Sequence, residues 1–446
     1  MNNNKLIIIL IMLIFLSSCS FKTNPAQKIA ELFGSQTSQD SSTSDNDNVE
    51  NSESLNSKST STESNFLPKF LNFDSDSLTK RTLNINLLES IDIGDEREIN
   101  STVIQLAYDN NYTLYTIDNS GTISAIDIRS LDKLWSKNID INVTSGLCYH
   151  DEKLFFGSNI GKLYGYSIND LNVGSGFIDS INLFDDSSIE TPTITNIQLK
   201  SEIASPGIGI GNSIFVKLGD GNVVSVNYQD QRVNWTHKGR NISLSIKGTA
   251  KIASDFDNVY IARDDGNLIS LNSDTGKLNW LSLISPRSGR NDLESLRDVE
   301  MTPIIDQGVL FVGFYQGSLA AVDVITGGII WKIPLSVHSN INLDTSNVYV
   351  ASSKGTLYSI DRYDGSINWD IVLNEDLLYT EPHIIGNKII TFSTKGDIAV
   401  IDRETGNLLH YENIIDELDF QTDIHLIDKV LYILSKNGRL NAININ

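Results

Sequence analysis

The feature that most constrains this sequence is a short segment that recurs eight times, in which Gly opens an apolar run ending at Asp, Asn or Ser. The eight segments are Gly121–Asp127, Gly161–Ser167, Gly221–Asn227, Gly266–Asn272, Gly317–Asp323, Gly355–Asp361, Gly396–Asp402 and Gly438–Asn444. Successive glycines lie 38 to 60 residues apart, and five of the intervals lie between 38 and 45. A period near 40 with several short strands per repeat is typical of a β-propeller, in which each repeat forms one blade.

Every Trp of the chain keeps a fixed distance from these segments. Eight residues separate the final Asp or Asn from Trp in five repeats, namely at Trp135, Trp235, Trp280, Trp331 and Trp369. We expect the Trp ring to pack between blades with its N–H on a backbone carbonyl, and the Asp or Asn to accept backbone N–H groups of the following turn. The spacing resembles the tryptophan-docking repeat of quinoprotein-type, or PQQ-like, propellers.

This resemblance, which covers about residues 100–446, implies an all-β, eight-bladed propeller. The strand that begins at Gly438 is followed by only a few residues, so the eighth blade lacks an outer strand of its own. We expect the N-terminal segment Thr82–Leu88 to supply it, because pairing there closes the ring and removes two exposed strand edges. The propeller domain is therefore predicted to span residues 81–446.

The first residues are typical of a secretion signal. A short positive start is followed by an unbroken apolar run, Leu6–Leu16, which is too short to span a bilayer comfortably. Leu16-Ser17-Ser18-Cys19 resembles the bacterial lipobox, which implies a signal peptide over residues 1–18 and a lipidated Cys19. Ser20 in place of Asp favours the outer membrane. The alternative is an ordinary signal peptide followed by an incidental Cys.

Residues 19–80 are predicted to be a lipidated Cys followed by a disordered tether. From Gly34 to Asn65 the chain is mainly Ser, Thr, Asn, Asp and Glu, which cannot bury enough apolar surface to offset the entropy of ordering. A flexible chain of about 60 residues spans roughly 45 Å, enough to hold a globular domain clear of a membrane.

Charge and cysteine content exclude several classes of function. The formal net charge of −22 argues against nucleic acid as a partner, because phosphate binding needs clustered Lys and Arg. The PQQ-dependent dehydrogenases that share the repeat carry a vicinal Cys pair, a Trp floor and a calcium site. Here Cys148 stands alone in an apolar context, and every Trp belongs to the repeat. We therefore predict no enzymatic activity, no quinone cofactor and no catalytic metal.

Two segments depart from the repeat and point to a partner-binding surface. Leu244-Ser-Ile-Lys-Gly248 and Leu296-Arg-Asp-Val-Glu300, followed by Thr302-Pro303, both fall between the last strand of one blade and the first strand of the next. They are similar to two neighbouring loops of the BamB family of propeller lipoproteins, whose usual patterns are Leu-Ser-Leu-Arg-Gly and Leu-Ser-Asp-Val-Asp-Thr-Thr-Pro.

The BamB resemblance implies a non-catalytic scaffold subunit of the outer-membrane β-barrel assembly complex, facing the periplasm. Its loops would bind the periplasmic POTRA domains of the central barrel protein BamA. The implied contacts are Leu244, Ile246, Lys247, Asp298 and Glu300. Three of them differ from the family pattern: Ile replaces Leu, Lys replaces Arg and Glu replaces Asp. Lys247 cannot reproduce the bidentate geometry of a guanidinium, so we expect a weaker interface.

Two alternatives stay open at this stage. Leu244 and Ile246 could be strand residues that face the core, with Asp298 and Glu300 as solvated loop charges. The chain could also be a propeller lipoprotein that binds a cell-wall or polysaccharide ligand, which an exposed groove lined with aromatic side chains would favour. The role of the long interval Ser175–Glu202 is not indicated by the sequence.

Overall fold

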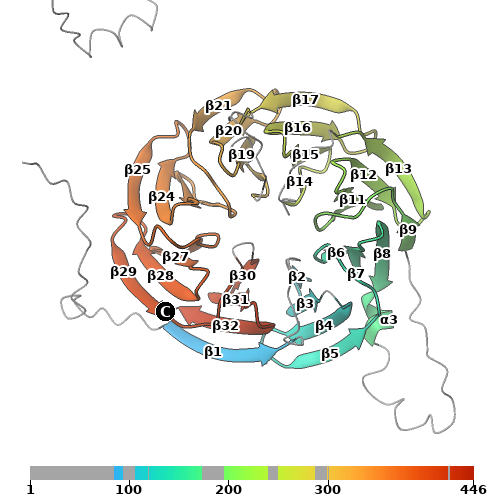
Figure 1. The fold of residues 1–446 in the computed structure, drawn as a ribbon, viewed down its shortest axis with the longest axis horizontal. Helices are drawn as coiled ribbons and strands as arrows, with labels where there is room; N and C mark the ends of the chain where they lie inside the picture. The colour runs from blue at the N-terminus through green and yellow to red at the C-terminus, as the bar shows by residue number, and fades with distance from the viewer. Residues whose placement is uncertain are drawn as a thin grey trace, which may run out of the picture. The chain divides into compact units, whose positions relative to one another are not determined.

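The described chain forms eight four-stranded antiparallel sheets arranged as the blades of a ring (Figure 1). The computed structural model describes residues 85–93, 106–118, 120–172, 195–239, 250–286, 299, 301–419 and 422–445, and all structural statements below concern these residues. In seven blades the strand order follows the sequence from the inner to the outer strand. The prediction of an all-β, eight-bladed propeller is confirmed.

Blades 1 to 4 contain the strands β2 to β17. Blade 1 comprises β2 (Ala107–Tyr108), β3 (Thr113–Ile117), β4 (Thr122–Asp127) and β5 (Lys133–Asn138); blade 2, β6 (Cys148–His150), β7 (Lys153–Gly157), β8 (Lys162–Ser167) and β9 (Thr195–Gln198); blade 3, β10 (Ile208–Ile210), β11 (Ser213–Lys217), β12 (Val223–Asn227) and β13 (Arg232–His237); blade 4, β14 (Ala253–Ser254), β15 (Asn258–Ala262), β16 (Asn267–Asn272) and β17 (Leu278–Leu283).

Blades 5 to 8 contain the strands β18 to β32 together with β1. Blade 5 comprises β18 (Ile304–Asp306), β19 (Val309–Gly313), β20 (Leu319–Asp323) and β21 (Ile329–Ile333); blade 6, β22 (Asn342–Leu343), β23 (Asn347–Ala351), β24 (Thr356–Asp361) and β25 (Ile367–Val372); blade 7, β26 (His383–Ile385), β27 (Lys388–Phe392), β28 (Asp397–Asp402) and β29 (Leu408–Asn413); blade 8, β30 (Ile424–Ile427), β31 (Val430–Leu434), β32 (Arg439–Ile445) and β1 (Ile85–Asp92).

Burial explains why the middle strands are apolar without alternation. In β19 and β20, as in most of their counterparts, four consecutive residues are buried, because neighbouring blades cover both faces of each sheet. The outer strands β17 and β25 instead alternate between exposed and half-buried residues, since only one face of each contacts the next blade. The core is therefore a series of apolar layers between blades.

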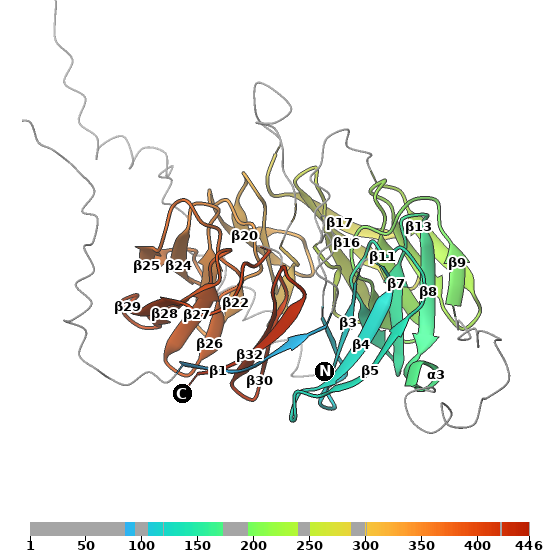
Figure 2. The same ribbon diagram turned by 60° about the horizontal axis from the view of Figure 1, so that its bottom comes forward.

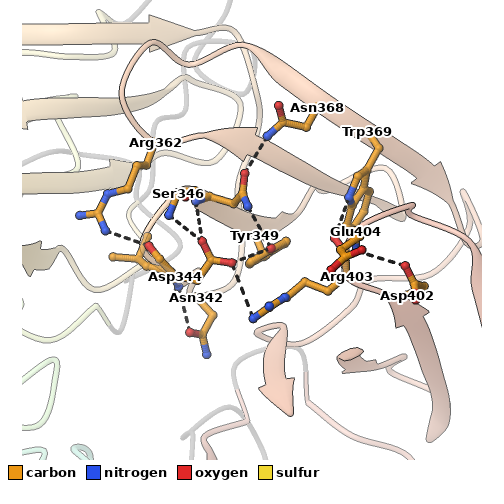
Figure 3. A network of polar contacts seen from close by, with 12 residues as sticks. Asn342, Asp344, Ser346, Tyr349, Arg362, Asn368, Trp369, Asp402, Arg403 and Glu404 are labelled. Carbon is orange, nitrogen blue, oxygen red and sulfur yellow. Dashed lines mark hydrogen bonds and ion pairs between the residues drawn. The ribbon is translucent and has the colours of Figure 1, made fainter. Parts of the chain in front are cut away.

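Trp side chains join consecutive blades as the spacing predicts. The Trp331 Nε1 donates to the Arg362 carbonyl oxygen at 2.8 Å, and Trp369 donates to the Arg403 carbonyl oxygen at 3.0 Å (Figure 3). Trp235 and Trp280 donate in the same way to carbonyls of the following blade. The Asp side chains that precede these turns accept backbone N–H groups, as Asp323 does from Thr326 at 2.7 Å.

An N-terminal strand closes the ring. Strand β1 pairs antiparallel with β32 from Ile85↔Ile445 to Asp92↔Arg439, with one irregularity between Leu87 and Glu89. The seam also holds a hydrogen bond from Ser90 Oγ to Asn441 Oδ1 at 2.9 Å. Figure 2 shows β1 lying along β32. The predicted closure is confirmed, and the described strand extends from Ile85 to Asp92.

Blade 2 departs from the other blades in its last connection. A short helix, α3 (Ile168–Asn172), follows β8, and the outer strand β9 begins only at Thr195. The long interval Ser175–Glu202 therefore lies partly inside blade 2, around its outer strand, and residues 173–194 are outside the described part of the chain. In the described ranges no helix is both long and apolar enough to cross a membrane.

Candidate functional site

The predicted partner residues lie outside the described part of the chain. This applies to Leu244, Ile246 and Lys247, which fall in residues 240–249, and to Asp298 and Glu300, which fall on either side of the described Val299. The lipidation residue Cys19 is also outside it, as are the signal peptide and tether over residues 1–80. These assignments stay predictions.

The strand bounds place the ends of both partner segments on one rim of the ring. Residues 240–249 fall between the outer strand β13 and the inner strand β14, and residues 287–300 fall between the outer strand β17 and the inner strand β18. We call the rim at which the outer strand of one blade connects to the inner strand of the next the connection rim. Blades 4 and 5 are neighbours, so the two segments re-enter adjacent blades on this rim.

Apolar anchors hold the chain where the segments re-enter the ring. Ala250 and Ile252 are 4% and 2% exposed, and Val299 and Met301 are fully buried. Ala250 and Val299 belong to the same apolar cluster between blades 4 and 5, and Met301 belongs to the next one. The points of re-entry are thus fixed on the apolar layers between blades.

Polar residues form a continuous network just inside these anchors. The Lys251 N–H donates to Thr302 Oγ1 at 3.0 Å, and the Thr302 N–H donates to Asn340 Oδ1 at 2.9 Å. The Asn340 side chain hydrogen-bonds Glu381. Lys251 Nζ donates to Asp423 Oδ2 at 2.8 Å, with side chains 29% and 14% exposed. We call these five residues the axial network.

The Lys251–Asp423 ion pair crosses the centre of the ring. Lys251 precedes β14 of blade 4, and Asp423 precedes β30 of blade 8. These blades are four positions apart among eight, and β14 and β30 face each other across the centre in Figure 1. A bond between them must therefore pass across the axial channel near the connection rim.

Glu381 is the electrostatically strained member of the network. Burial raises the pKa of Glu381 to about 8, and the nearby charge of Asp423 acts in the same direction. The hydrogen bond from Asn340 and the charge of Lys251 favour the ionised form but do not outweigh burial. The carboxyl group is therefore largely protonated at neutral pH, which limits its repulsion of Asp423.

Two histidines beside the network are neutral for the same reason. Burial lowers the pKa of His383 to about 4, and the neighbouring His425 contributes to the shift. Burial also lowers the pKa of His425, with Asp423 opposing the shift. His383 Nε2 and His425 Nε2 have no hydrogen-bond partner in the described structure. These rings therefore contribute bulk rather than charge to the channel wall.

A cavity of about 510 Å³ runs along the inner strands β18 and β22 to Glu381. Its far end is acidic, but the carboxylates there already have partners. Arg362 Nη2 donates to Asp306 Oδ2 at 2.6 Å. Tyr349 donates its hydroxyl to Asp344 Oδ2 at 2.9 Å (Figure 3). Burial would raise the pKa of Asp344, but hydrogen bonds from Ser346, Tyr349 and Asn347 hold it below its ordinary value.

The described polar side chains of this channel form a network of hydrogen bonds and ion pairs. Among the described residues, no three His, Cys, Asp or Glu side chains are grouped to hold a metal ion. Cys148 is 6% exposed, and burial raises the pKa of its thiol to about 12, so it remains protonated. The interpretation of Cys148 as a small buried apolar residue is confirmed.

Comparison with known proteins gives several relatives that carry the same name. The family described as "Outer membrane protein assembly factor BamB" matches residues 194–371, which extend from β9 to β25 and include both partner segments. Proteins of that name from Legionella pneumophila and Escherichia coli are 28% and 27% identical, each over 36% of this chain and 41% of the relative. The match thus spans about two fifths of their length. The Yersinia pestis protein is 20% identical over 74% of this chain and 81% of its own.

Solved structures show how the fold is shared. The crystal structure of BamB from Moraxella catarrhalis matches with a TM-score of 0.67 and 20% identity, covering 81% of this chain and all of that one. Quinohemoprotein alcohol dehydrogenase from Comamonas testosteroni matches with a TM-score of 0.57 and 11% identity, covering 80% and 76%. Likeness at this identity establishes the propeller alone. The family match across blades 3 to 6, the relatives that carry the same name and the common ring together make this chain similar to the BamB family.

Proposed function

We propose that this protein is a non-catalytic scaffold subunit of the outer-membrane β-barrel assembly complex. It aids the insertion of outer-membrane proteins by binding the POTRA domains of BamA from the periplasmic side of the outer membrane. The observation that carries the proposal is the family match to residues 194–371, which contains both segments that resemble the partner-binding loops. A lipid on Cys19 would hold the propeller at the membrane.

The positions of the described re-entry points support this function. Residues 240–249 and 287–300 are about 50 positions apart in sequence, yet their re-entry points, Ala250 and Met301, occupy adjacent blades of the connection rim. Apolar residues flanked by both charge signs suit a protein interface, whose core excludes water while its edge pairs charges.

A polysaccharide ligand is the weaker candidate. Sugar-binding grooves present several aromatic faces together, whereas the most exposed aromatic side chains in the described ranges lie on different blades. Phe256 is 79% exposed in blade 4, Tyr363 is 65% exposed in blade 6, and Tyr112 is 42% exposed in blade 1. We therefore keep the assembly function as the conclusion.

The test is a titration of the mature chain with the POTRA domains of BamA from the same organism. Lys247→Glu and Asp298→Lys should each weaken binding by about tenfold or more at low salt, and by less at high salt, because charge reversal at an interface replaces attraction with repulsion. Leu244→Ala should cost about 2 kcal/mol in binding if Leu244 is a buried anchor. Each variant is first checked by thermal melting.

Lys133→Glu is the matched control. Lys133 is exposed on β5 in blade 1, away from blades 4 and 5, so the same charge reversal there should leave the affinity unchanged. Wild-type binding to no POTRA domain would refute the proposed function. Binding of cell-wall fragments instead would support the polysaccharide alternative.

A further inference from the structure

The axial network is more than the propeller repeat requires. In each of blades 4 to 8, one residue of the inner strand pairs with the third residue of the next strand, as in Ala253↔Tyr260 and His383↔Ile390. Each member of the axial network lies two residues before that inner-strand residue, so all five occupy the same position of the repeat. In blades 2 and 3 the same register places Gly146 and Pro206 there. These blades form without a polar side chain at this position, so the polar network of blades 4 to 8 is an addition to the fold.

Stability alone is a poor explanation of that addition. An ion pair that is partly withdrawn from water gains little over well-packed apolar side chains, because desolvation offsets the attraction. Ion pairs of this kind instead fix one geometry, since each charge has a single satisfactory partner. The Lys251–Asp423 pair joins two blades that no backbone connection and no apolar layer brings together.

The network coincides with both re-entry points of the partner segments. One residue, Ala250, separates Lys251 from residues 240–249, and one residue, Met301, separates Thr302 from Glu300. The hydrogen bond from the Lys251 N–H to Thr302 Oγ1 links the two points directly. The Thr302 N–H and Lys251 Nζ then tie them to blade 6 and blade 8.

We propose that the axial network, through the Lys251–Asp423 ion pair, fixes relative to each other the two points at which the partner-binding segments re-enter the ring. Lys251 and Asp423 are positioning residues in this scheme, because they set where the segments re-enter the ring. The inference rests on the proposed function for its partner and on the described hydrogen bonds for its geometry.

The first measurement is hydrogen exchange at the amides of Lys251 and Thr302, in the full mature chain without any partner. Asp423→Asn and Lys251→Met should raise exchange at both amides several-fold. Both variants remove the Lys251–Asp423 ion pair, and without it the hydrogen bonds of the Lys251 and Thr302 amides open more often. Lys251→Arg, which keeps the charge, should restore most of the protection.

The second measurement is the affinity for the POTRA domains. Asp423→Asn should weaken binding about tenfold, while the melting temperature changes little. A tenfold change in affinity is within the range observed for substitutions of residues that do not contact the partner. Asp306→Asn is the matched control, because it removes the same charge from a carboxylate paired with Arg362 of the next blade, at the opposite end of the channel. This variant should bind like wild type.

The outcomes separate the two proposals. If wild type binds no POTRA domain, the proposed function fails, and the exchange data still decide whether the network fixes the re-entry points. Wild-type exchange and affinity in Asp423→Asn would overturn the positioning inference alone. Equal loss of affinity in Asp423→Asn and Asp306→Asn would reduce the network to a general contribution to stability and would likewise overturn it.

Discussion

Four of the docking Trp side chains pack against a glycine of the next blade, namely Trp235, Trp280, Trp331 and Trp369. A Cβ on Gly327 would lie 2.6 Å from the Trp280 ring, and the φ angle of +71° at Gly327 is one that glycine adopts most readily. Blade 8 has no such turn, because its fourth strand comes from the start of the chain, and blade 7 carries His410 at the position that Trp occupies in blade 1 and blades 3 to 6. His410 pairs instead with Glu412 at 3.1 Å.

Glu381 should make the stability of the propeller depend on pH. The folded chain holds the Glu381 proton more tightly than the unfolded chain does, so the free energy of unfolding falls as pH rises from its ordinary pKa of 4.5 toward 8. The buried histidines act oppositely, but only below their ordinary pKa of 6.5. Between pH 6.5 and 8 the Glu381 contribution therefore stands alone among these three groups.

We predict that Glu381→Gln removes this fall. Urea denaturation at pH 6.5 and pH 8 should show a loss of roughly 1 kcal/mol in wild type and a smaller one in the variant, since a full pKa unit corresponds to about 1.4 kcal/mol and the side chain is partly accessible from the channel. Glu375→Gln, at an exposed position of the preceding connection, controls for net charge. Parallel pH profiles for wild type and Glu381→Gln would contradict the assignment.

At the scale of elements, the sequence predicted the strands and turns whose positions depend on nearby residues and on the adjacent blade. The Gly-initiated strands and the Trp positions depend on alternation, turn residues and the adjacent blade, and all of these leave a periodic trace in the sequence. Strand β9 and helix α3 were not predicted, because the interval around Ser175 interrupts that period. The Lys251–Asp423 pair was not predicted either, since it joins residues 172 positions apart that meet only once eight blades have closed.

Strand β1 gives the element-scale prediction. Deleting residues 85–92 should lower the melting temperature by roughly 5 °C or more and promote association, because β32 loses its neighbour and exposes an unpaired edge. Deleting residues 36–62, a stretch predicted to bury nothing, should change the melting temperature by about 1 °C or less. The two deletions are compared by calorimetry and light scattering. Equal losses of stability would show that the predicted tether boundary is wrong.

At the scale of the whole molecule, the same ring serves an enzyme in one relative and an assembly factor in others, so function depends on what the rims carry. In this chain the strand bounds place the re-entry points of both partner segments on one rim, over a channel crossed by an ion pair. A ring of this kind is useful at a membrane only if it is held near its partner, which is the role that we assign to Cys19.

Cys19→Ala should therefore abolish lipidation and release the propeller from the membrane without unfolding it. Metabolic labelling with a fatty acid should mark wild type and leave the variant unlabelled, because the Cys19 sulfur is the predicted attachment point in Leu16-Ser17-Ser18-Cys19. The purified variant should still bind POTRA domains with wild-type affinity, whereas recovery of the assembly complex from solubilised membranes should fall, since the anchor raises the local concentration of the two partners. Cys148→Ser, at a buried thiol, is the control for loss of a cysteine and should retain the label. Undiminished label in Cys19→Ala would show that the lipobox assignment is wrong, while loss of POTRA affinity in the soluble variant would mean that the anchor takes part in binding directly.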